Sequence, residues 1–187
     1  TAYPGDLAGF NAAVGNRLVI VDFDSIAPGT DITGQSIQGA TFLAPAAALI
    51  VVRGSDTFTP PGFFDPEGNA SNRLFPTSGE NCLSPGGIVL GPGPNPSVEG
   101  DSIRLVFNTP VTAVGFDILE QLADGGHYYV RVYDTNNTQV FTDDWVTPNQ
   151  SSSSGGSYFY GVVSSDQNIA RLEFDDTDNN NIFPDAN

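Results

Sequence analysis

Short apolar segments with a period of two run through the second half of the chain and limit it to folds built from strands. In SIRLVFN (102–108), Ile103, Leu105 and Phe107 share one face. Arg104 lies on the other face, as expected for a strand with one buried side. Further strand-like segments, rich in β-branched and aromatic residues, cover 111–120, 127–134, 138–145, 157–163 and 168–175.

The first half predicts one short helix followed by strands. In YPGDLAGFNAAVGN (3–16), Asp6 is placed to cap a helix and Gly15 to end it. The next segment, RLVIVDFD (17–24), is almost continuously apolar, which predicts a central, buried strand. Two shorter strand segments follow at 40–44 and 48–53.

These elements predict one all-β domain over residues 1–187. Many short strands joined by turns favour an antiparallel β-sandwich, jelly-roll-like, with a short N-terminal helical segment at 1–16. Residues 54–100 are dense in proline and glycine, so we interpret them as a long loop excursion. They are not a linker, because the strands that follow resemble the second half of one sheet system.

The net charge of the chain limits the classes of partner that it can bind. The formal net charge is −16, from 22 acidic residues against six arginines and no lysine. Such a surface repels nucleic acid, and a divalent cation would relieve its self-repulsion, which makes calcium the expected cofactor. No apolar run reaches the roughly 18 residues of a membrane span. No leader opens the sequence, so we expect any signal peptide to have been removed or not included.

Three segments stand in a characteristic order: FNAAVGNRLVIVDFDSIAPGTDITGQSIQGATFLAP, SIRLVFNTPVTAVGFDIL and YFYGVVSSDQNIARLEF. This order of motifs resembles exported bacterial β-sandwich proteins of the PEP-CTERM and related surface-anchor type, which are jelly-roll and lectin-like. The resemblance implies an extracellular or cell-surface location and a tie to exopolysaccharide. In that group a further strand follows the acidic loop, whereas this sequence stops at Asn187. We therefore expect either that the chain is cut there, or that another chain pairs with an open edge strand beside 168–175.

The segment FDDTDNNNIFPDAN (174–187) predicts a calcium site. Asp176, Asp178 and Asn180 stand at i, i+2 and i+4, the spacing at which alternate oxygens converge on one ion. Asp175, Asp22 and Asp24 would join them if the first and last strands are neighbours. The alternative is a solvated acidic turn.

Two groups of side chains are candidates for binding a sugar. Tyr129 and Arg131 share the outward face of their strand, where a ring can stack and a guanidinium can donate hydrogen bonds. The alternative is that arginines on this face pair with nearby acids such as Asp117 and Glu173. The second group is an exposed aromatic platform, against the alternative that its tryptophan fills the core: Trp145, Tyr158 and Tyr160.

Catalytic motifs are missing. The chain has one histidine, one cysteine and no G-x-S-x-G nucleophile elbow, so we expect no catalytic residues and no enzyme activity. The sequence predicts a calcium-stabilised structural or assembly subunit of a surface, fibre or extracellular matrix. A carbohydrate-binding module on exopolysaccharide is the alternative, and a polysaccharide hydrolase with paired carboxylates is a third hypothesis.

Overall fold

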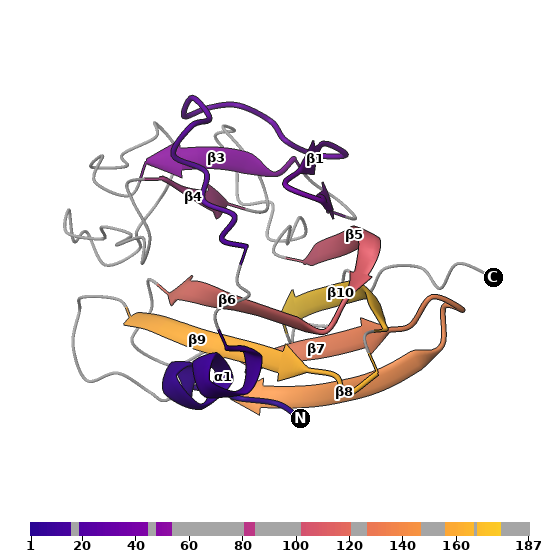
Figure 1. The fold of residues 1–187 in the computed structure, drawn as a ribbon. Helices are drawn as coiled ribbons and strands as arrows, with labels where there is room; N and C mark the ends of the chain where they lie inside the picture. The colour runs from indigo at the N-terminus through magenta and orange to yellow at the C-terminus, as the bar shows by residue number, and fades with distance from the viewer. Residues whose placement is uncertain are drawn as a thin grey trace.

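The computed structural model describes residues 1–15, 19–44, 48–53, 81–84, 102–120, 127–146, 156–166 and 168–176. One helix precedes a series of short strands (Figure 1). These elements are α1 (Leu7–Val14), β1 (Ser36–Ile37), β2 (Ala40–Leu43), β3 (Ile50–Arg53), β4 (Asn81–Ser84), β5 (Ile103–Val111), β6 (Ala113–Glu120), β7 (His127–Tyr133), β8 (Gln139–Val146), β9 (Gly156–Val163) and β10 (Ile169–Asp176).

The strands form an all-β, sandwich-like fold in which every pairing is antiparallel. The large sheet has six strands in the order β1-β2-β5-β10-β7-β8, and two small sheets are formed by β3-β4 and β6-β9. The antiparallel class predicted from the sequence is confirmed. The last strand, β10, pairs with β5 on one side and β7 on the other. The expectation of an open edge beside 168–175 is therefore wrong.

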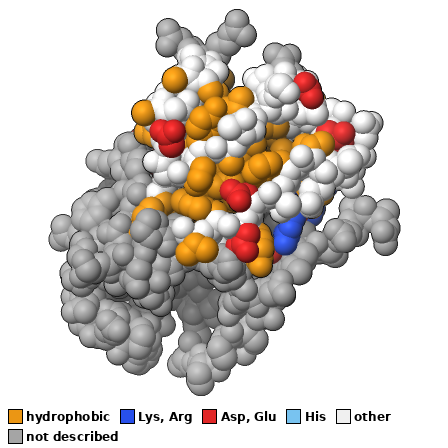
Figure 2. Space-filling view, turned by 90° about the horizontal axis from the view of Figure 1, so that it is seen from below, with side chains coloured by type: hydrophobic (Ala, Val, Ile, Leu, Met, Phe, Trp, Pro, Cys, Tyr) orange, Lys and Arg blue, Asp and Glu red, His pale blue; other side chains and the backbone are white. Residues whose placement is uncertain are grey.

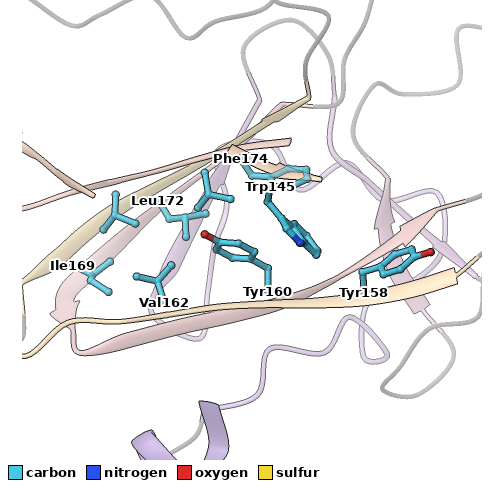
Figure 3. Packing of buried hydrophobic residues seen from close by; sticks show 9 residues of the cluster. Trp145, Tyr158, Tyr160, Val162, Ile169, Leu172 and Phe174 are labelled. Carbon is cyan, nitrogen blue, oxygen red and sulfur yellow. The ribbon is translucent and has the colours of Figure 1, made fainter. Parts of the chain in front are cut away.

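The main core lies between the large sheet and the β6–β9 pair. Leu172 and Phe174 on β10 and Val130 and Val132 on β7 are buried against Tyr160 of β9. Figure 3 shows Leu172, Phe174 and Tyr160 in the space between the two layers. Burial of such apolar surface contributes roughly 25 cal/mol per Å², so this cluster stabilises the sandwich.

A second core lies under β3 and β4. Ala40 and Phe42 of β2 pack with Leu49 and Val51, all of them buried. Leu105 of β5, with Phe107 beside it, packs against both cores, so both small sheets cover the same face of the large sheet. The opposite face of the large sheet is thereby left for polar side chains.

The N-terminal segment packs on β9. Its backbone extends that sheet, because Tyr3 N–H donates to Gly161 O and Gly5 N–H to Phe159 O, both at 2.8 Å. The capping role predicted for Asp6 is confirmed, since its carboxylate accepts from Gly9 N–H at 2.8 Å. The buried ring of Phe10 then anchors α1 over the strand.

One predicted strand is absent. Residues 19–24 form no strand, and Val19 and Ile20 are 73% and 64% exposed. Val21 and Phe23 pack at the margin of the second core. The apolar run thus covers the core with alternate side chains and makes no ladder of its own. No helix in the described ranges is long and apolar enough to cross a membrane.

Candidate functional site

The outer face of the large sheet gathers a charged network around β10. Strand alternation sends Leu172 and Phe174 into the core and turns Arg171, Glu173 and Asp175 outward. The register then places Glu173 opposite an arginine on each neighbouring strand: Arg104 of β5 and Arg131 of β7. Three of the chain's six arginines therefore meet two carboxylates on one face.

Glu173 is the centre of this network. Its Oε1 accepts from Arg104 Nε at 2.9 Å and lies 2.7 Å from Arg104 Nη2. Arg171 Nε lies 3.2 Å from the same oxygen, but its N–H is not directed at an acceptor, so this contact is one of charge attraction. With Glu173 only 3% exposed, these two guanidinium groups replace the water that the carboxylate loses.

Asp175 is engaged in the same way. The buried Ser102 hydroxyl donates to Asp175 Oδ1 at 2.5 Å. Arg131 Nη1 lies 3.6 Å from Asp175 Oδ2. Asp175 was predicted to be a calcium ligand. In the structure its side chain is only 2% exposed and already contacts a hydroxyl and a guanidinium.

Arginines also cover the tyrosines of this face. Arg171 Cζ lies 3.7 Å from the centre of the Tyr133 ring, and Arg131 Cζ lies 5.5 Å from that of Tyr129. Burial raises the pKa of Tyr133, as do the charge of Glu173 and a hydrogen bond to it. The sequence-based alternative of arginine–carboxylate pairing on this face is confirmed for Glu173. Tyr129 and Arg131 stay partly exposed as candidate ligand contacts.

The aromatic platform predicted from Trp145, Tyr158 and Tyr160 is wrong. These residues are 8%, 9% and 0% exposed, because all three side chains point between the sheets (Figure 3). The ring centroids of Trp145 and Tyr160 are 4.9 Å apart. Tyr160 Oη donates to Asp143 Oδ2 at 2.5 Å, and burial first, then this carboxylate, raises the pKa of the phenol. The alternative that Trp145 fills the core is confirmed.

The predicted calcium ligands are not assembled in the described part of the chain. Asp178 and Asn180 lie outside the described residues, and Asp176 ends β10. No group of three or more His, Cys, Asp or Glu side chains within the described ranges is arranged to hold a metal.

The remaining two candidates lie far from β10 in the topology. Asp24 accepts a hydrogen bond at 2.8 Å from Asn81 N–H of β4, beside Asp22. Asp22 and Asp24 were expected to join the site only if the first and last strands were adjacent. They are not adjacent, because β10 lies between β5 and β7.

A feature that the sequence reasoning missed is the edge formed by β8. In the described part of the chain β8 pairs only with β7, and Val140 and Val146 are 45% and 63% exposed. Figure 2 shows hydrophobic side chains gathered on the face of the molecule that carries α1 and β8. The signal was present in VFTDDWV (140–146), which makes up seven of the eight residues of β8 and contains no lysine or proline.

No protein-family model matches the chain, and neither the curated proteins nor the solved structures give a match. Function is therefore inferred from the geometry of this chain.

Proposed function

We propose that the protein is a non-enzymatic, exported β-sandwich that serves as an assembling structural subunit of a cell surface or extracellular matrix. The observation that carries this proposal is the edge of β8. A strand with one neighbour offers a row of N–H and C=O groups to another chain, and proteins that avoid such pairing protect their edges.

The other edges differ from β8 in their protection. β1 is two residues long, which is too short to guide pairing. The free side of β9 is occupied by the N-terminal segment through Tyr3 and Gly5. The free side of β6 also has no strand neighbour in the described part, but β6 carries no large hydrophobic side chain that is described as exposed, unlike Val140 and Val146 of β8. β8 combines eight residues with two exposed valines and has no such cover in the described part.

The charged network supports a structural role over a catalytic one. A hydrolase of polysaccharides needs one carboxyl group to donate a proton and another to attack or activate water. Glu173 is bound by arginine, and Asp175 by arginine and serine, so the paired carboxylates of β10 act as internal ties between strands.

Carbohydrate binding is the second candidate, and one observation favours it. Tyr129 and Arg131 are partly exposed on the same face and 5.5 Å apart, a pairing of ring and guanidinium suited to a sugar. Arg131→Ala together with Tyr129→Ala should abolish retention on an exopolysaccharide column. Retention unchanged by both substitutions would reject this site.

Sedimentation velocity tests the assembling role. The wild-type chain should sediment as larger species as its concentration rises, because mass action favours pairing. Thr142→Lys, on the exposed side of β8, should remain monomeric, since a lysine on an edge strand disfavours strand addition. A wild-type chain that is monomeric at every concentration, in calcium and in chelator, would overturn the proposal.

A further inference from the structure

We infer that the strand completing this edge is β8 of a second copy, paired antiparallel about a two-fold axis through Asp143. The inference rests on the proposed assembling function and names its partner. It would join two six-stranded sheets into one continuous sheet across the dimer.

The sequence of β8 is self-complementary about Asp143. Reading outward from this residue in VFTDDWV, polar Thr142 faces polar Asp144, then aromatic Phe141 faces Trp145, and Val140 faces Val146. In an antiparallel pair centred here, each of these residues lies opposite its counterpart in the partner. Like residues thus meet on both faces of the sheet.

The directions of the backbone groups of β8 are compatible with this register. The Asp144 N–H donates to Asp143 Oδ1 at 3.1 Å, so it points away from β7. Backbone groups of alternate residues point to the same edge of a strand, so residues 140, 142 and 146 also face outward. A two-fold axis at residue 143 pairs even-numbered residues with even-numbered ones, which are the residues that carry the outward groups. A shift of the pairing register by one residue, which moves the axis to a point midway between two residues, would set outward groups against inward groups and form no ladder.

Side chains select between the registers that remain. Moving the axis to Thr142 or Asp144 keeps the backbone ladder, but it places a polar residue opposite one of the valines: Asp144 opposite Val140, or Thr142 opposite Val146. Only the axis at Asp143 sets Val140 against Val146, the two exposed apolar side chains of the strand. Phe141 and Trp145 on the inner side already pack in the main core, so the pairing would extend that apolar layer across the dimer.

Charge opposes the pairing and makes it depend on salt. Asp143 would face the partner's Asp143, and each chain has a formal net charge of −16. Like charges opposite each other destabilise a strand pair, and salt screens them. The dimer should therefore be weak in dilute buffer and strengthen with sodium chloride.

Disulfide trapping tests the register. In a Cys82→Ser background, Asp143→Cys places a thiol on the axis, at a non-hydrogen-bonded pair where Cα atoms are about 4.5 Å apart. The matched controls, Thr142→Cys and Asp144→Cys, are on more exposed positions but would lie beyond the roughly 7 Å limit for a disulfide to their own copies. We expect covalent dimer at least tenfold faster from Asp143→Cys. Equal rates, or a faster control, would overturn this register.

A second variant avoids any change to the core. Val140→Lys alters an exposed side chain and should raise the dimer dissociation constant at least tenfold in sedimentation equilibrium. Val19→Lys is the control, because Val19 is 73% exposed and lies outside β8. Association that neither Val140→Lys nor the cysteine variants affect would overturn this pairing and leave the assembling function standing. A chain that never associates would overturn both.

Discussion

At the scale of single residues, Phe10 fits closely against two paired glycines. Gly115 of β6 lies opposite Gly161 of β9, and the missing side chains leave room for the rings of Phe10 and Phe159. A Cβ atom at Gly161 would lie 2.5 Å from Phe10 Cδ2 and 2.9 Å from the Phe159 ring. These glycines therefore determine where the N-terminal helix can sit.

Gly161→Ala should lower the free energy of unfolding by about 2 kcal/mol, because the added methyl group overpacks this contact. Urea unfolding followed by circular dichroism measures the change. In a Phe10→Ala background the cost of Gly161→Ala should shrink, since one of its two neighbours has gone. An equal cost in both backgrounds would show that the clash with Phe10 is not the cause.

The turn between β7 and β8 depends on a charged side chain. Asp134 Oδ1 accepts from the N–H groups of Thr138 and Asn136, each at 2.8 Å, while Asn137 takes a φ of 62°. The hydrogen bond from Thr138 N–H, and then that from Asn136, lowers the pKa of Asp134. Thr135, Asn136 and Asn137 thus form the hairpin turn from β7 into β8.

Asp134→Asn should destabilise the protein in a pH-dependent way. A carboxyl group whose pKa is lower in the folded state stabilises the fold above its unfolded pKa, and this contribution disappears as pH falls through the folded pKa. The difference in urea midpoint between wild type and Asp134→Asn should thus be constant near neutral pH and vanish on acidification below about pH 4. A difference that persists unchanged into acid would exclude a charge effect.

Single residues of β9 also show what could not be predicted from the sequence. Alternation correctly placed Tyr158 and Tyr160 on one side of their strand, but Phe159 on the other side is equally apolar. Since both faces of β9 are covered, one by the core and one by α1, alternation alone did not reveal which face was buried. The aromatic platform was therefore assigned to side chains that fill the interior.

At the scale of elements, local pattern predicted the strands of the second half well and their neighbours poorly. It also predicted a strand over 17–24 that is absent at 19–24, and it missed β4, which lies within the segment 54–100 that was interpreted as a loop. The six strand segments of the second half correspond to β5 to β10 within a few residues. Pairing is non-local, and the alternation of apolar residues in 168–175 does not indicate that β10 lies between β5 and β7. The alternating acids of this segment were the available signal, because Glu173 pairs with Arg104 of β5 and Asp175 with Arg131 of β7.

Glu173→Gln should be among the most destabilising polar substitutions. It leaves Arg104 and Arg171 facing each other without their shared carboxylate, and breaking a buried ion pair on one side costs about 3 kcal/mol. Asp166→Asn, on an exposed turn, is the control with the same change of charge and should cost little. Equal effects in denaturant unfolding would mean that the network contributes nothing specific.

At the scale of the whole molecule, the most prominent electrostatic feature is the net negative charge. A formal charge of −16 on 187 residues resists compaction, so cations should stabilise the fold. Among the described acids, Glu173 and Asp175 are held in ion pairs, and Asp134 is held in a turn. Any specific calcium site is therefore expected in the segment after β10, where Asp178 and Asn180 supply the ligands predicted from spacing.

Calcium should raise the melting temperature, and a chelator should lower it again, by ligand linkage worth about 2.7 kcal/mol at a hundredfold excess over Kd. Asp178→Asn should remove most of this shift, whereas Asp166→Asn should retain it. Magnesium at the same ionic strength separates a specific site from general screening. Equal shifts with both ions, or no shift after demetallation, would argue against the predicted site.

The position of Trp145 gives the protein a built-in optical reporter. It is the single tryptophan, and its ring lies 4.9 to 6.5 Å from those of Tyr160, Tyr128 and Tyr158. Its emission should be blue-shifted and fed by energy transfer from these tyrosines. Because Trp145 also lies on β8, the same fluorescence should report both the melting of the core and the arrival of a second strand at the sheet edge, without any added label.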